Sequence, residues 1–152
     1  MTRSDHFESA TDWEAATRLV EFEPRRPAYT AGFALSTLSV HVTDHRKRRI
    51  PKGARTLEAH YGGFVLAQQQ TPSIPEAQRR ALSRAYGQAA TTVHVAGHEG
   101  RGYELGPITD PDDIDGRAPA VVVWNDSAMF YLVASDQLEA AILLRIASSM
   151  YD

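Results

Sequence analysis

The last third of the sequence, residues 120–150, constrains the fold more than any other segment. It reads AVVVWNDSAMFYLVASDQLEAAILLRIASSM, in which two apolar runs flank a short polar break and an amphipathic stretch follows. The two runs predict a β-hairpin. The apolar side chains after it repeat at the i, i+4 spacing of one helix face: Leu138, Ile142, Ile146 and Met150. Leu143 and Ala147 widen this ridge. Asp136, with Glu139 three residues later, is the expected N-cap, so the segment predicts a strand pair and a helix that covers it.

A second hairpin is predicted around two consecutive glycines. Residues 57–68 read LEAHYGGFVLAQ, with alternating apolar side chains on either side of the glycine pair. Glycine adopts the positive φ angles that a two-residue primed turn requires. We therefore expect the chain to reverse at this pair, with Tyr61 facing Phe64 across the two strands.

Other segments carry shorter patterns. Thr11, followed three residues later by Glu14, matches the N-cap of a helix over residues 13–20. Prolines end that helix, and residues 32–44 then alternate apolar and polar side chains as a strand does. The remaining predicted elements are a helix over 75–88 and short strands over 91–95 and 102–105, the last two joined by a GHEGR loop.

Together these elements predict an α+β fold. We expect a single, mostly antiparallel sheet of about six strands, with the N- and C-terminal helices packed on one face. Residues 1–10 are polar and are expected to form a flexible N-terminus, followed by a single domain over 11–152. An antiparallel sheet that is covered on one face leaves its other face for water, a partner or an apolar ligand.

Composition and charge limit which classes of protein this chain can belong to. Of the 152 residues, 43% are hydrophobic and 23% charged, as in ordinary globular domains. The formal net charge of −3 gives no overall attraction to nucleic acid, and we expect a basic run at 45–52 and an acidic run at 110–116 to be solvated loops. With no cysteine and no apolar run near the roughly 18 residues of a membrane span, neither a thiolate site nor a membrane span is expected. A cytoplasmic location follows, unless an anchored domain was excised.

Several stretches resemble a family of small bacterial domains. In FEPRRPAYTAGFAL, a phenylalanine and a proline-rich connector precede a glycine-led strand, and LAQQQ resembles a family strand that ends on glutamine. VVVWNDSAMFYLVAS followed by LLRIASSM is similar to the tryptophan strand, tyrosine strand and terminal helix of the family. That family is the domain of unknown function at the extracytoplasmic end of anti-sigma-factor-like and sporulation-associated bacterial membrane proteins. It is itself distantly similar to the outer-membrane lipoprotein carrier fold.

The resemblance spans about two-thirds of the chain and has no catalytic signature to carry over. It implies a binding or sensing module and does not imply a reaction. The family usually follows a membrane anchor, for which this sequence offers no apolar stretch. The TPSIPEAQRRALSRAYG excursion and the acidic loop also have no counterpart in the family.

The leading hypothesis is a non-catalytic bacterial binding or regulatory domain. It would recognise a protein segment or an apolar ligand on its sheet, without a cofactor. Large aromatic side chains on strands supply the contact area that such a groove needs. The residues expected to line the groove are Tyr61, Phe64, Tyr131 and the neighbouring His60.

Three alternatives stay open. A zinc site needs ligands about 2 Å from the metal, so it would take one histidine from each of three strands: His41, His60 and His94. A small enzyme could instead use Glu58 and His60 as an acid/base pair, together with His41 or His94. The chain could also be a homo-oligomeric structural module, such as a homodimer in which an exposed edge strand pairs with its twin.

Overall fold

The computed structural model of the protein describes residues 6–20, 22–42, 55–70, 90–107, 117–126 and 129–152. The basic run at 45–52, the helix expected over 75–88 and the acidic run at 110–116 lie outside the described residues. Within the described ranges, one large antiparallel sheet carries two helices. The expected α+β class is confirmed.

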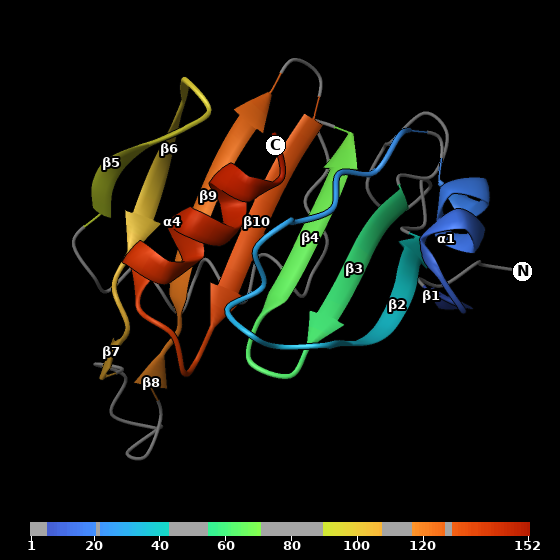
Figure 1. The fold of residues 1–152 in the computed structure, drawn as a ribbon, viewed down its shortest axis with the longest axis horizontal. Coiled ribbons are helices and arrows are strands. Elements are labelled where there is room, and N and C mark those ends of the chain that lie inside the picture. Colours follow the sequence, from blue (N-terminus) through green and yellow to red (C-terminus); the bar gives the residue numbers. More distant parts are fainter. Residues whose placement is uncertain (1–5, 21, 43–54, 71–89, 108–116, 127–128) are drawn as a thin grey trace, which may run out of the picture.

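The sheet has eight strands in the order β1-β2-β3-β4-β10-β9-β6-β5, and each neighbouring pair is antiparallel (Figure 1). The strands are β1 (His6–Ala10), β2 (Leu35–Val42), β3 (Arg55–Tyr61), β4 (Val65–Gln70), β5 (Ala90–Val95), β6 (His98–Tyr103), β9 (Ala120–Asp126) and β10 (Met129–Ser135). Two short strands, β7 (Gly106–Pro107) and β8 (Arg117–Ala118), form a separate pair. The expected number of about six strands is therefore too low.

Strand β1 is the element of the eight-stranded sheet that the sequence pattern did not indicate. Residues 1–10 are expected from their polarity to be flexible, yet β1 pairs with β2 from its first residue, opposite Val42, to its last, opposite Leu38. The stretch HFESA lacks an alternating apolar pattern. An edge strand is held mainly by backbone hydrogen bonds on one side, so it needs few buried side chains.

The sheet consists of two halves that meet along one seam. Strands β1 to β4 follow one another in both sequence and space, while β5, β6, β9 and β10 form the second half with β10 innermost. The seam is the pairing of β4 with β10, which runs from Met129 opposite Gln70 to Ala134 opposite Val65. This pairing joins segments that lie far apart in the sequence.

The hairpin at 57–68 forms in the expected register, and the Tyr61 N–H donates to the Phe64 carbonyl at 2.9 Å. The expected reason for its glycines is wrong, because neither has a φ in the left-handed region. A Cβ on Gly63 would instead overlap the ring of Phe33. Close approach of an aromatic ring is what requires glycine at this turn.

Helix α1 (Trp13–Leu19) packs against β1 and β2. Its N-cap is Asp12, whose side chain accepts a hydrogen bond from the Ala15 N–H at 2.8 Å. The sequence pattern placed the cap one residue early, on Thr11. Both residue types are good N-caps, so local composition does not separate the two positions.

Helix α4 (Ala140–Ser149) packs on β9 and β10 (Figure 1). Its N-cap is Glu139, whose side chain makes no capping hydrogen bond, so the expected cap at Asp136 is wrong. Leu138 and Ile142, from the expected apolar ridge, are only half-buried. The buried ridge is turned toward the two residues that were expected to widen it, Leu143 and Ala147, and it includes Ile146 and Met150.

A connector, residues 22–34, crosses the sheet on the same side as α4 (Figure 1). Gln68 holds its middle, because the side-chain carbonyl accepts from the Arg25 N–H at 2.8 Å and the amide donates to the Arg25 carbonyl at 2.9 Å. Further along, the Tyr29 N–H donates to Ser149 Oγ at 2.9 Å. The connector is thereby fastened to both the sheet and α4.

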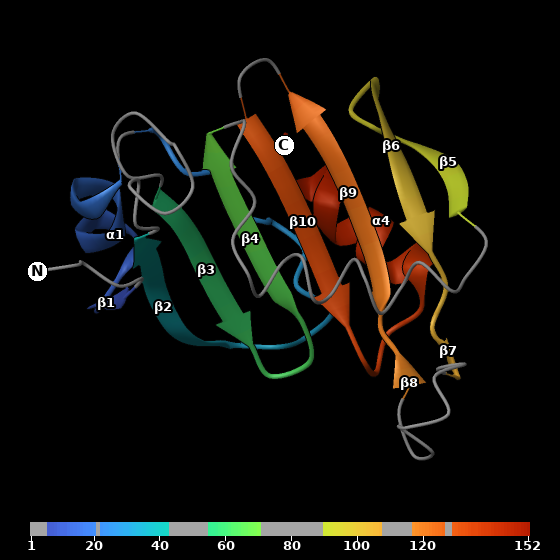
Figure 2. The same cartoon turned by 180° about the vertical axis from the view of Figure 1, so that it is seen from behind.

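The face opposite the helices, called the far face below, is seen in Figure 2. Its centre is buried, and a second apolar cluster lies there: Ala67, Tyr103, Val121, Phe130 and Leu132. Beside it, four polar side chains on β2, β3 and β4 are also buried: His41, Thr56, Glu58 and Gln69. The Thr56 hydroxyl donates to Gln69 Oε1 at 2.6 Å. The centre of this face therefore does not offer an open apolar surface.

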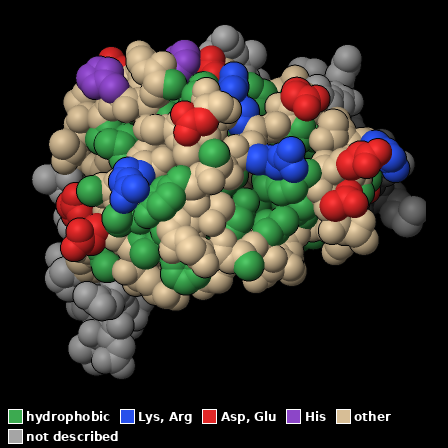
Figure 3. Space-filling view, viewed as in Figure 1, with side chains coloured by type: hydrophobic (Ala, Val, Ile, Leu, Met, Phe, Trp, Pro, Cys, Tyr) green, Lys and Arg blue, Asp and Glu red, His purple; other side chains and the backbone are tan. Residues whose placement is uncertain are grey.

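Acidic, basic and hydrophobic side chains are interspersed over the helix side of the described residues (Figure 3). No helix in the described ranges is long and apolar enough to cross a membrane.

Replacing Gly63 by alanine tests the contact at the turn. Gly63→Ala is expected to lower the free energy of unfolding by about 1–3 kcal/mol, the usual cost of overpacking, because the added methyl group must displace Phe33. Gly62→Ala is the matched control, since a Cβ there would lie 3.3 Å from the nearest Phe33 atom. Urea unfolding measures both variants, and equal losses would contradict the role given to Phe33.

Candidate functional site

Three of the four residues expected to bind a ligand lie on the helix side of the sheet. Tyr61 stacks on the buried Phe64, with ring centroids 4.4 Å apart. Tyr131 is buried and stacks on Trp124 at 5.1 Å. Since side chains alternate along a strand, His60 points from β3 to the far face. The structure does not bring the four side chains together on one surface.

The three histidines of the expected metal site share the far face but lie far apart. His41 is opposite Thr56, four residues from His60, or about 13 Å at 3.3 Å per residue. Strand β5, which carries His94, is five strands from β3, or about 24 Å at the usual strand spacing. The described residues contain no group of three side chains that could hold a metal ion. The three-histidine arrangement therefore does not form.

Glu58 and His60 do lie side by side on the far face of β3. Glu58 is 7% exposed; burial raises its pKa, and the charge of nearby His60 partly offsets this. A buried carboxyl beside an imidazole resembles an acid/base pair. Of the two candidate third members, His41 stacks on Phe7 with centroids 4.6 Å apart, and His94 lies across the sheet.

A surface hollow of about 480 Å³ opens on the far face at the β5 end of the sheet. Four strands line it, β5, β6, β9 and β10. Val123 and Phe130, which is 8% exposed, provide its apolar part. Its exposed polar side chains are Thr92, Glu99, Arg101 and Asn125. The hollow thus combines a small apolar floor with polar groups around it.

The charged groups of this hollow are available to a bound molecule. Arg101 lies between Thr92 on β5 and Val123 on β9, both of which are uncharged. Glu99 lies opposite His94. Neither Arg101 nor Glu99 forms an ion pair with another residue in the part of the chain that the structure describes. A ligand carrying a carboxylate could therefore pair with Arg101 without displacing an existing partner.

A second hollow, of about 400 Å³, lies between α1 and the connector. Its walls include Trp13 and Arg26, whose guanidinium lies 6.0 Å from the Trp13 ring centre. Arg18 and Glu14 on its helical wall already pair with each other at 2.8 Å. Glu23 and Arg26, the other two charged residues of its lining, form no ion pair among the described residues, so this hollow offers the same number of unpaired charges as the one beside β5.

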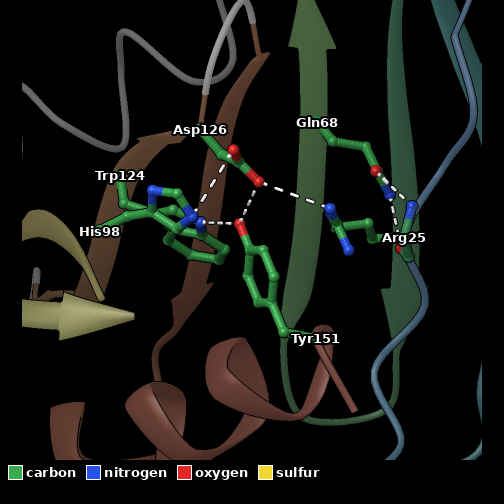
Figure 4. Close-up of polar contacts among 6 residues, drawn as sticks. All are labelled: Arg25, Gln68, His98, Trp124, Asp126 and Tyr151. Atoms are coloured by element: carbon green, nitrogen blue, oxygen red, sulfur yellow. Dashed lines mark hydrogen bonds and ion pairs between the residues drawn. The ribbon is translucent and has the colours of Figure 1, made fainter. Parts of the chain in front are cut away.

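A polar cluster on the helix side, around Asp126, joins four parts of the chain (Figure 4). The Tyr151 hydroxyl accepts from Trp124 Nε1 at 2.9 Å and donates to Asp126 Oδ2 at 3.0 Å. Arg25 Nη2 and His98 Nε2 each lie 3.6 Å from a carboxylate oxygen of Asp126. The Arg25 guanidinium also lies 4.3 Å from the centre of the Tyr151 ring. These contacts fasten the connector, β6, β9 and the end of the chain to one another.

The phenol groups of Tyr151, in the Asp126 cluster, and of Tyr131, next to it, stay protonated. Burial raises the pKa of Tyr151 to about 12; the Trp124 hydrogen bond opposes this rise, and Asp126 adds to it. Burial likewise raises the pKa of Tyr131, against the lowering effect of Arg25. A protonated phenol donates a hydrogen bond and is a poor nucleophile. The contacts of the cluster position the connector and the end of the chain against β9. Among the described ranges, no serine or threonine hydroxyl hydrogen-bonds to His98.

Comparisons with protein-family models, with curated proteins and with solved structures found no match to this chain. The resemblance to the anti-sigma-factor-like domain therefore stays a prediction.

Sequence reasoning did not find the hollow beside β5. Its residues come from four strands whose order in the sheet is not readable from local patterns. One local signal was present in Ala96-Gly97, which forms the tight turn between β5 and β6. The sequence reading placed GHEGR in a loop, whereas β6 already begins at His98.

Glu58 gives the protein a pH-dependent stability. Because its pKa is raised in the folded state, the folded protein holds this proton to higher pH than the unfolded chain, and its stability falls as pH rises above about 4.5. Glu58→Gln is therefore expected to be more stable than the wild type at pH 7, by about 1.4 kcal/mol for each unit of the pKa rise. The difference should shrink toward pH 4.

Urea unfolding across this pH range measures the effect. Since the charge of His60 lowers the pKa of Glu58, His60→Gln is expected to steepen the loss of stability with pH. A Glu58→Gln variant with an unchanged pH profile would contradict the account.

The Asp126 cluster is tested by removing its carboxylate. Asp126→Ala leaves the Tyr151 hydroxyl without its acceptor and Arg25 without its counter-charge, so we expect a loss of about 1–3 kcal/mol in the free energy of unfolding. Asn125→Ala, at the adjacent exposed position, is the matched control and should change stability by less than about 0.5 kcal/mol. Denaturant unfolding at pH 7 compares the two, and equal values would rule out the anchoring role.

Proposed function

We propose that this chain is a non-catalytic bacterial binding or regulatory domain that recognises a protein segment on its sheet, at the hollow beside β5. The observation that supports this best is the hollow itself. Its volume of about 480 Å³ falls within the range of natural ligand sites. Its apolar floor at Val123 and Phe130 could bury a side chain, and its polar wall could hydrogen-bond to a peptide backbone.

The lining favours a polypeptide over a purely apolar ligand. Thr92, Glu99, Arg101 and Asn125 would each lose water on binding an apolar molecule without gaining a hydrogen bond, and such losses are costly. A peptide segment carries both donors and acceptors along its length. Polar side chains around a small apolar floor therefore suit it.

The acid/base pair of the enzyme alternative is not part of this hollow. Glu58 and His60 lie on β3, three strands from β9, or about 14 Å at the usual strand spacing. A molecule seated on Val123 would not reach them by a hydrogen bond. The geometry therefore favours binding at the hollow over acid/base catalysis there.

The proposal is tested with a display library of random peptides about twelve residues long, selected against the wild-type protein. We expect enrichment of peptides that carry an acidic residue, and Arg101→Glu should weaken their binding about tenfold or more, the effect of roughly 1.4 kcal/mol. Arg18→Glu, a charge reversal on α1, is the matched control and should leave binding unchanged. Fluorescence anisotropy of labelled peptides gives the dissociation constants.

Two results would overturn the proposal. In the first, no peptide is enriched over an unrelated protein. In the second, the enriched peptides bind wild type, Arg101→Glu and Arg18→Glu equally, so that their site lies elsewhere.

A further inference from the structure

Strand β5 ends the sheet (Figure 2), and its residues border the hollow. Its residues, ATTVHV, pair with β6 in an unbroken register from Ala90 opposite Tyr103 to Val95 opposite His98. Natural edge strands are commonly protected by lysine, proline or a β-bulge. Strand β5 has none of these, and three of its six residues, Thr91, Thr92 and Val93, form a β-branched run with high strand propensity.

The turn that leads out of β5 determines which backbone groups face outward. Ala96 and Gly97 have φ angles of 50° and 86°, the pattern of a two-residue type I′ turn. In such a hairpin the pair next to the turn is hydrogen-bonded, and bonded and non-bonded pairs then alternate. Val95, Val93 and Thr91 therefore direct their N–H and C=O groups toward β6. Ala90, Thr92 and His94 direct theirs away from it.

The outward-facing residues are also those whose side chains reach the far face. Ala90 and Thr92 line the hollow, whereas Val95 is fully buried in the core on the helix side. A strand added at β5 would therefore bond to the same residues that border the hollow. Every second side chain of that strand would lie on the far face.

We propose that the protein segment binds by strand addition: it pairs with the outer edge of β5 as a ninth strand and places an acidic side chain toward Arg101. This inference rests on the proposed function. A residue opposite Thr92 on the added strand lies two strands from Arg101, about 10 Å at the usual spacing. An arginine and a glutamate side chain on the same face of the sheet are long enough to meet across that distance. The guanidinium of Arg101 has no ion-pair partner among the described residues, so it favours a segment with a carboxylate at that position.

A second copy of this chain fits the edge less well. Two β5 strands paired about a two-fold axis would present Ala90, Thr92 and His94 to each other's hollow. None of these side chains carries a carboxylate for Arg101. A partner segment with an acidic residue therefore matches the site better than self-pairing.

Thr92→Pro tests the pairing directly. Proline lacks the N–H that Thr92 directs outward, while the bonds of β5 to β6 use other residues, so an edge strand tolerates it. The probes are the peptides enriched against the wild type. We expect Thr92→Pro to weaken their binding about tenfold, through the lost hydrogen bond and the blocked approach of the strand. Thr92→Ala keeps the N–H and removes only the side-chain contact with the hollow, so it measures the contribution of the side chain, and Thr92→Pro is expected to weaken binding several-fold more than Thr92→Ala.

A second measurement does not depend on the fold of any variant. Each backbone nitrogen of the best peptide is methylated in turn, and binding is measured to the wild-type protein. Strand addition predicts losses at every second position, because alternate N–H groups of a strand face its neighbour. Uniform tolerance of methylation would overturn the inference even if Thr92→Pro does not fold.

The outcomes separate the two proposals. If Arg101→Glu weakens binding and Thr92→Pro does not, the peptide docks by side chains alone, and the strand-addition inference falls while the binding function stands. If neither variant weakens binding, both fall. If sedimentation shows a wild-type dimer that Thr92→Pro dissociates, the edge is used by a second copy, which overturns the partner segment.

Discussion

The side chain of Trp124, on β9, is buried against the end of the chain. Its indole N–H therefore needs a hydrogen-bond acceptor within the protein. Tyr151 accepts that bond, and its own hydroxyl donates a hydrogen bond to Asp126. The partly buried Asp126 carboxylate lies 3.6 Å from both Arg25 and His98. The chain of contacts that begins at the Trp124 indole N–H thus holds the connector, β6 and the C-terminal residues against β9. Strands β6 and β9 also line the hollow on the far face, so the contacts of this cluster help to hold the walls of the hollow in place.

The two central hairpins were predictable because their information is local. Two apolar runs on either side of a polar break give the strand pair at 120–135, and the register at 57–68 follows from its turn. Helix α4 was also found, although its cap is Glu139 and its buried ridge is turned. The buried ridge is turned because most side chains of this helix are apolar, so packing against the sheet decides which of them are covered.

The rest depended on contacts between distant segments. Strand β1 has no apolar alternation and exists because β2 offers it a pairing edge. The three strand histidines do share one face, but strand order separates them, and strand order is not encoded in any short stretch. Gly63 is similar: a glycine in a turn suggests backbone freedom, whereas its constraint is the ring of Phe33, thirty residues earlier. The hollow beside β5 could not be predicted either, because its residues come from four strands that only the sheet order brings together.

The seam between β4 and β10 has a consequence for how the molecule folds. Each half of the sheet is assembled largely from neighbouring segments, so each can form quickly by short loop closures. Pairing Gln70 with Met129 closes a far longer loop, and the entropy of that closure is lost before the contacts across the seam can offset it. We expect this docking of two preformed halves to limit the rate of folding. Until it occurs, the inner edges of both halves expose unpaired backbone, which makes the unjoined halves prone to association with other chains.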